Sequence, residues 1–222
     1  MDIQNIVVFL SELERNNTKV WFEANKSRYE ELRKAWTEGV GALIMGIAGF
    51  DSELQTVQAK DCLFRIYRDV RFSKDKSPYK TTFSAVMSPE GKKSPMPLYY
   101  VQIDAKGELL VAGGVYMPER EILAAIRAFI AAYPERVSAV VNDTAFRAAF
   151  GGLEMQDTLT RLPKGYDDDV PHPELIKLKH FIASKTLHWQ HTSTEEVLQN
   201  IVQHYYTMYP LVCLLREAIA HG

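Results

Sequence analysis

The spacing of apolar residues changes along this chain, and that change constrains the fold more than any other feature. Residues 2–15 and 18–47 carry apolar side chains at the three- and four-residue spacing of helices. The pattern then becomes four short runs rich in β-branched and aromatic residues and separated by turn signals: CLFRIYRDV, TTFSAVMS, LYYVQID and ELLVAGGVY. Helical spacing returns after residue 118. This order of elements predicts an α+β fold.

Short links between consecutive strands favour antiparallel pairing, and the run ASKTLHW near the C-terminal end can add a strand. A chain of 222 residues with 46% hydrophobic residues can bury a core without disulfides or metal. We predict a single domain over residues 1–222, with an antiparallel sheet of about four to five strands. Helices from the N-terminal and C-terminal parts flank this sheet.

Residues that begin or interrupt helices support this division. Thr18 can cap a helix, and Pro118, followed by Glu119, suits a first turn. Ser193 and Glu196 have the spacing of a capping box before the last helix. Pro210 should kink or restart that helix, because its ring lacks an N–H donor and clashes with the preceding turn.

The two cysteines and the hydropathy pattern predict a protein of the reducing cytoplasm. Cys62 and Cys213 lie far apart in apolar surroundings, which indicates buried thiols rather than a disulfide. The start MDIQNIVVFL has no basic region and no small-residue cleavage site, so it does not resemble a secretory signal. The apolar run at residues 39–50 is shorter than the ~20 residues that span a bilayer, and we expect no membrane partner.

Positive charge is concentrated in one window of the chain. Residues 60–93 hold nine basic and four acidic side chains, a net charge of +5. The whole chain has a net charge of −2, so the remainder carries −7. Within the window, the stretch RIYRDVRFSKDKSPYKTTF interleaves arginine and lysine with aromatic residues.

This stretch predicts a binding site for an anion. An arginine on the apolar face of a strand is costly unless it is paired or reaches a ligand. Pro78 disfavours helix at the residue before it, so the lysine-rich part forms a loop whose hydroxyls and backbone donors suit phosphate or carboxylate oxygens. A second loop, carrying Lys164, joins the cleft if it folds over the sheet. The predicted ligand-binding residues are Arg65, Arg68, Arg71, Ser73, Lys74, Lys76, Tyr79, Lys80 and Lys164.

Two other functions fit the same residues. Asp69 and Asp75 can neutralise neighbouring arginines, which makes the stretch a structural ion-pair network. In that case Trp21, Phe22 and Tyr29 are candidate anchors for a protein partner, although their helical spacing favours the core. Alternatively, the cations and aromatic rings could bind nucleic acid. The pI of about 6.3 argues against this last function.

The sequence assigns no reaction, cofactor or oligomeric state. No GxSxG, P-loop or GxGxxG motif occurs, and Ser73 and Ser77 have no evident histidine base. All six histidines lie in the last quarter, without the spacing of a known metal motif. We therefore predict no metal site, and whether the protein is an enzyme stays open.

Several segments together resemble one family. They are NNTKVWFEANKSRYEEL (16–32), the run from Arg65 to Thr81, GGVYMP (113–118), LPKGY (162–166) and HPELIKLKHF (172–181). These motifs are similar to those of the domain of unknown function numbered twenty-four sixty-one (DUF2461), and the resemblance covers nearly the whole chain. It implies that the basic stretch is a hallmark of the family. It implies no activity and no catalytic residue.

Overall fold

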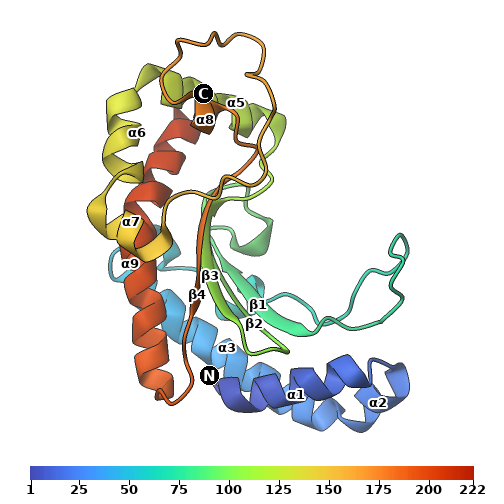
Figure 1. The fold of residues 1–222 in the computed structure, drawn as a ribbon. Coiled ribbons are helices and arrows are strands. Elements are labelled where there is room, and N and C mark those ends of the chain that lie inside the picture. Colours follow the sequence, from blue (N-terminus) through green and yellow to red (C-terminus); the bar gives the residue numbers. More distant parts are fainter. The chain divides into compact units, whose positions relative to one another are not determined.

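The computed structural model describes all 222 residues apart from the side chain of Lys93. Four strands, β1 (Thr82–Met87), β2 (Leu98–Asp104), β3 (Leu109–Val115) and β4 (Phe181–Leu187), form one antiparallel sheet in the order β1-β2-β3-β4 (Figure 1). Helices precede and follow the strands, which confirms the predicted α+β class. In β2 the buried residues Tyr99, Val101 and Ile103 alternate with half-buried ones, as the two faces of a pleated strand require.

The helices before the sheet are α1 (Ile3–Arg15), α2 (Lys19–Ala24), α3 (Lys26–Ala48) and α4 (Ala59–Cys62), with a 3₁₀ turn at Ser52–Leu54. A second 3₁₀ turn, Gly91–Lys93, lies between β1 and β2. After β3 come α5 (Arg120–Ala132), α6 (Pro134–Val141), α7 (Thr144–Phe150), α8 (Pro173–Ile176) and α9 (Thr194–Ala220). Among these helices of the described chain, none is both long enough and apolar enough to cross a bilayer.

The chain divides into two compact units. The first consists of Met1–Lys92, Tyr100–Val111 and Thr186–Gln203, and the second of Lys93–Tyr99, Ala112–Lys185 and His204–Gly222. Strands β2, β3 and β4 and helix α9 each contribute residues to both units. The single domain expected from the sequence stays a prediction.

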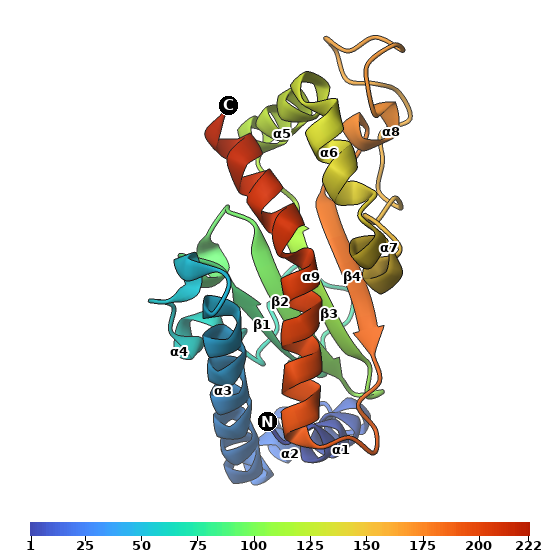
Figure 2. The same ribbon diagram turned by 90° about the vertical axis from the view of Figure 1, so that its left-hand side faces the viewer.

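An aromatic cluster forms the core of the first unit where α1 and α2 pack against the N-terminal part of α3 (Figure 2). Phe22 of α2 is fully buried, and its ring centre lies 5.1 Å from that of Tyr29 in α3. Phe9 of α1 lies 6.1 Å from the same tyrosine ring. Thr18 accepts a hydrogen bond from the Trp21 amide and caps α2, as predicted.

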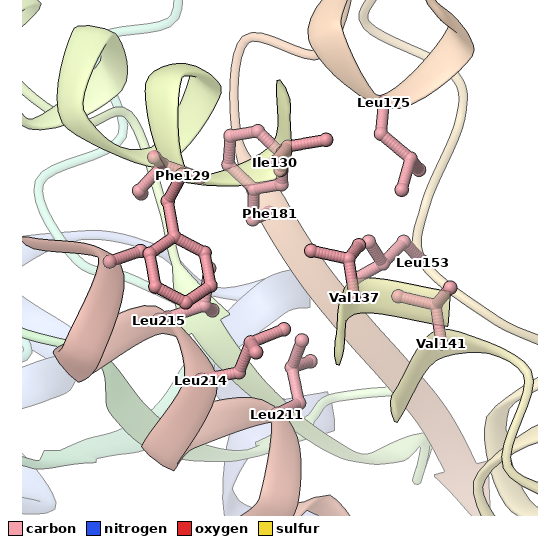
Figure 3. Close-up of a pocket in the computed structure, with 12 residues that line it drawn as sticks. Phe129, Ile130, Val137, Val141, Leu153, Leu175, Phe181, Leu211, Leu214 and Leu215 are labelled. Carbon is pink, nitrogen blue, oxygen red and sulfur yellow. The ribbon is translucent and has the colours of Figure 1, made fainter. Parts of the chain in front are cut away.

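In the second unit, α5, α6 and α7 follow one another beside the C-terminal half of α9 (Figure 2). Apolar side chains from α5, α6, α8, α9 and β4 converge in Figure 3, among them Phe129, Ile130, Val137, Leu175, Phe181, Leu211 and Leu215. They leave about 10 Å³ of free space, roughly the room for one water molecule. This part of the second unit is a packed core rather than a ligand pocket.

The secondary structure differs from the sequence predictions in three places. The expected strand CLFRIYRDV forms only single bridges at Leu63 and Tyr67, because its partner segment contains Pro78, which has no N–H to donate to a ladder. The helix expected over residues 18–47 is interrupted at Asn25. Helix α9 continues through Pro210 as one element instead of restarting there.

Candidate functional site

The basic stretch forms an extended arm of the first unit, which we call the basic arm (residues 63–80). Its two sides are held together by the Arg68 amide, which donates to the Pro78 carbonyl at 2.9 Å, and the Lys80 amide, which donates to the Ile66 carbonyl at 2.7 Å. Figure 1 shows the arm as the long loop that leads into β1 and reaches away from it. The sequence favours this shape because the apolar residues Leu63 and Ile66 are buried near the base, while serine and lysine residues at positions 73–77 occupy the distal part.

Tyr79 fastens the base of the arm to the helices of the first unit. Its side chain is only 3% exposed, and its ring stacks on Phe22 with the ring centres 4.0 Å apart. The Asn17 side chain accepts a hydrogen bond from the Tyr79 amide and donates one to the Tyr79 carbonyl, both at 3.0 Å. Tyr79, predicted as a ligand-binding residue, therefore lies in the core and positions its neighbours.

Two of the predicted arginines are paired with aspartates of the arm itself. Arg71 donates to both carboxylate oxygens of Asp69, at 2.9 and 2.6 Å. The Arg68 guanidinium forms an ion pair with Asp75 and also donates to the Ser77 carbonyl at 3.1 Å. Hydrogen bonds from Ser77, and then from Arg68, hold the pKa of Asp75 well below its usual range.

Three other cations gather at the base of the arm, and we call Arg65, Lys80 and Lys92 the cation triad. The Lys92 ammonium donates to the Leu63 carbonyl at 2.9 Å, and the Lys80 ammonium lies 5.1 Å from the centre of the Phe64 ring. Burial, together with the charges of Arg65 and Lys92, lowers the pKa of Lys80. Within the described part of the chain, no carboxylate lies within 4.0 Å of the charged nitrogens of this triad.

An open hollow of about 390 Å³ lies beside the triad and includes Lys80 in its wall. The lining residues are Glu14, Asn17, Arg68, Asp75, Ser77, Tyr79, Lys80, Thr81 and Thr82. Its volume falls in the range of small-molecule sites, which is about 300 to 1,000 Å³. The hollow therefore combines two basic side chains with hydroxyl, amide and carboxylate groups.

A family model described as a conserved hypothetical protein (DUF2461) matches residues 5–213. The chain belongs to the DUF2461 family. No curated protein and no solved structure matches it. The family description names no activity, so the function of this DUF2461 protein must be argued from its own side chains.

The remaining predicted site residues of the DUF2461 chain are spread along the arm and beyond it. The Ser73 hydroxyl accepts a hydrogen bond from Arg68 at 3.3 Å, and the Lys76 ammonium donates to the Val70 carbonyl at 3.0 Å. Lys74 is exposed on the distal part of the arm. Lys164 belongs to the second unit, so its predicted convergence with the arginines stays a prediction.

Four lining residues of this DUF2461 site lie inside the basic stretch but were not predicted as ligand-binding, namely Asp75, Ser77, Thr81 and Thr82. Sequence reasoning also missed three residues outside that stretch. Lys92 was counted in the basic window but not assigned to the site, and Asn17 lay inside a motif that was used only for the family resemblance. Glu14 gave no signal, because a single exposed acid near the end of a helix is common on protein surfaces. All three meet the arm through contacts between segments that are distant in sequence.

Near the arm, the described residues show neither a cluster of metal ligands nor a reactive thiol. No three His, Cys, Asp or Glu side chains among them are placed to hold a metal ion. Cys62 is buried, and burial raises the pKa of its thiol to about 11, so it is a poor nucleophile at neutral pH.

Proposed function

We propose that the cation triad and the adjoining hollow bind a small molecule that carries a phosphate or carboxylate group. This proposal rests on a difference between the basic residues of this region in whether they have an acidic partner. Arg68 and Arg71 form ion pairs with aspartates, whereas within the described chain no cation of the triad forms one, although the charge of Arg65 also acts on Asp69. The ion-pair network that was the alternative to binding accounts for the first two arginines and leaves the triad unexplained.

Gathering like charges without a counter-ion is unfavourable. Two unit charges about 4 Å apart interact by ~1 kcal/mol in water and by ~4 kcal/mol near a protein surface. Partial burial lowers the pKa of Lys80, and repulsion from Arg65 and Lys92 lowers it further. An anion that bonds to these groups replaces repulsion with charge-assisted hydrogen bonds, which are about twice as strong as neutral ones.

We expect pyrophosphate or citrate to raise the melting temperature of the wild-type protein at low ionic strength, since a ligand that prefers the folded state stabilises it. Lys80→Gln should weaken the affinity measured by calorimetry about tenfold or more, because it removes a charge that lines the hollow. Arg65→Gln should weaken it less, because Arg65 does not line the hollow and acts only through the positive potential beside it. The two probes distinguish a preference for phosphate from one for carboxylate.

Lys34→Gln is the matched control, because it removes one exposed positive charge from α3, away from the hollow. This variant should keep the affinity within about twofold of wild type, since distant surface charges are screened by salt. If Lys34→Gln and Lys80→Gln weaken the affinity equally, the affinity depends on the net charge of the protein and not on Lys80 in the hollow. If neither probe binds the wild-type protein, the proposal is wrong.

One observation favours single-stranded nucleic acid as a second candidate ligand. Phe72 lies on the distal part of the basic arm with 95% of its surface exposed, and the Arg71 guanidinium lies 5.8 Å from its ring centre. Tyr67 is also exposed, at 47%. Exposed rings among cations are the features with which proteins stack the bases and follow the backbone of single strands.

If this second candidate is right, an oligothymidine labelled with a fluorophore should bind with an affinity that falls steeply as salt rises. Phe72→Ala should then weaken binding by about 1–3 kcal/mol, the contribution of one stacked base. Val20→Ala, at an 83% exposed apolar residue of α2, controls for the loss of exposed apolar surface. An oligonucleotide that fails to bind in low salt, or that binds Phe72→Ala as tightly as wild type, excludes this candidate.

A further inference from the structure

The hollow beside the cation triad also contains an acidic group whose role is not explained by anion binding. Glu14, in the last turn of α1, is exposed and lines the hollow together with Lys80. Among the described residues, it has no hydrogen-bond or ion-pair partner. In contrast, Asp75, the other acid of the lining, is engaged by Arg68 and Ser77.

Glu14 and Lys80 share one hollow without neutralising each other. Their charged atoms are more than 4.0 Å apart, since they form no ion pair. A ligand that satisfies both must present an anionic group to the ammonium and hydrogen-bond donors to the carboxylate, because an ionised carboxylate only accepts hydrogen bonds. The hollow therefore selects for a molecule with two chemically different ends.

The rest of the lining indicates which donor the second end carries. Thr81 and Thr82 contribute hydroxyl-bearing side chains to the same hollow. A hydroxyl both donates and accepts hydrogen bonds, so several hydroxyls of a ligand can bond to the carboxylate and to these threonines together. An ammonium group only donates hydrogen bonds, so it cannot accept one from the threonine hydroxyls.

We infer that the hollow takes a phosphate ester bearing several hydroxyl groups, of the sugar-phosphate class. The phosphate lies at Lys80, with Arg65 and Lys92 adding to the positive potential. The hydroxyl-bearing part lies toward Glu14 and the threonines. This inference rests on the proposed anion site and adds the identity of the uncharged part of its ligand.

The test compares ribose 5-phosphate with inorganic phosphate by calorimetry. The wild-type protein should bind the sugar phosphate at least about tenfold more tightly, a difference of ~1.4 kcal/mol. Glu14→Ala should lose most of that preference, because the hydroxyls lose a charged acceptor. The same variant should bind inorganic phosphate as well as wild type or better, because a negative charge has been removed from the hollow.

Glu31→Ala is the matched control, since it removes an exposed acid of α3 that does not line the hollow. It should retain the full preference for ribose 5-phosphate. Equal binding of the two compounds by the wild-type protein, or tighter binding of phosphoethanolamine than of ribose 5-phosphate, overturns the inference and leaves the anion site standing. Binding of citrate without any binding of phosphate also overturns the sugar-phosphate inference and leaves the anion site standing. If none of these compounds binds, the anion site itself fails.

Discussion

Replacing Gly114 by alanine should lower the free energy of unfolding by more than about 3 kcal/mol, which places it among the largest effects of single substitutions. Gly114 has a φ angle of +118°, and a Cβ at this position would lie 2.0 Å from the Phe181 carbonyl oxygen and 3.1 Å from its carbon. Both contacts are to the backbone at the start of β4, so no side-chain rotation relieves them. In Gly114→Ala, β3 and β4 must therefore move apart locally, or the backbone at residue 114 must adopt another conformation.

The control for Gly114 is Gly165→Ala, which tests the backbone angle without the steric contact. Gly165 has a φ angle of +98°, and a Cβ built there meets nothing within 4 Å. We expect a loss of about 1–2 kcal/mol for this variant, the strain of a left-handed conformation alone. Urea titrations followed by circular dichroism measure both losses. Similar losses in the two variants would contradict the close approach of β3 to β4.

Phe22→Ala should cost about 3–5 kcal/mol of stability, as is usual when a buried phenylalanine is truncated. Phe22 is 0% exposed and lies between the helices and the arm, with its ring centre 5.1 Å from that of Tyr29 and 4.0 Å from that of Tyr79. Its loss should also release the base of the arm. The affinity for pyrophosphate should therefore fall, although Phe22 does not line the hollow.

Val20→Ala is a suitable comparison for Phe22→Ala because it shortens an apolar side chain of the same helix that is 83% exposed. Its stability should stay within about 0.5 kcal/mol of wild type. Pyrophosphate affinity is then measured for both variants at a temperature where each remains folded. A folded Phe22→Ala protein with unchanged pyrophosphate affinity would show that the arm does not depend on this aromatic contact.

The parts of the fold that depend on neighbours in sequence were predicted well. The run LYYVQID corresponds to β2 from Leu98 to Asp104, and its alternation alone indicates which side chains are buried. The Ser193 amide donates to the Glu196 carboxylate at 2.9 Å, as the capping-box spacing predicted.

Elements that depend on a distant partner were predicted less well. Residues 62–70 have strand-like composition, but a strand needs an unbroken ladder, and their partner segment contains Pro78. The pairing of Arg71 with Asp69 follows from residues two apart, so the ion-pair alternative could be raised from sequence. Nothing local indicated that Lys92 would lie near Lys80 or that Asn17 would hold Tyr79.

The sequence by itself determined that strands lie between helical segments and that positive charge is concentrated in one stretch, because periodicity, capping and charge are properties of adjacent residues. Only the tertiary structure decided which of those charges are neutralised and which face a hollow. Arg68 and Arg71 are paired with aspartates, whereas Lys80, which lines the hollow together with Arg68 and Glu14, forms no ion pair. The physical reason is that electrostatic interactions depend on distance in space, and chain folding brings together residues separated by tens of positions.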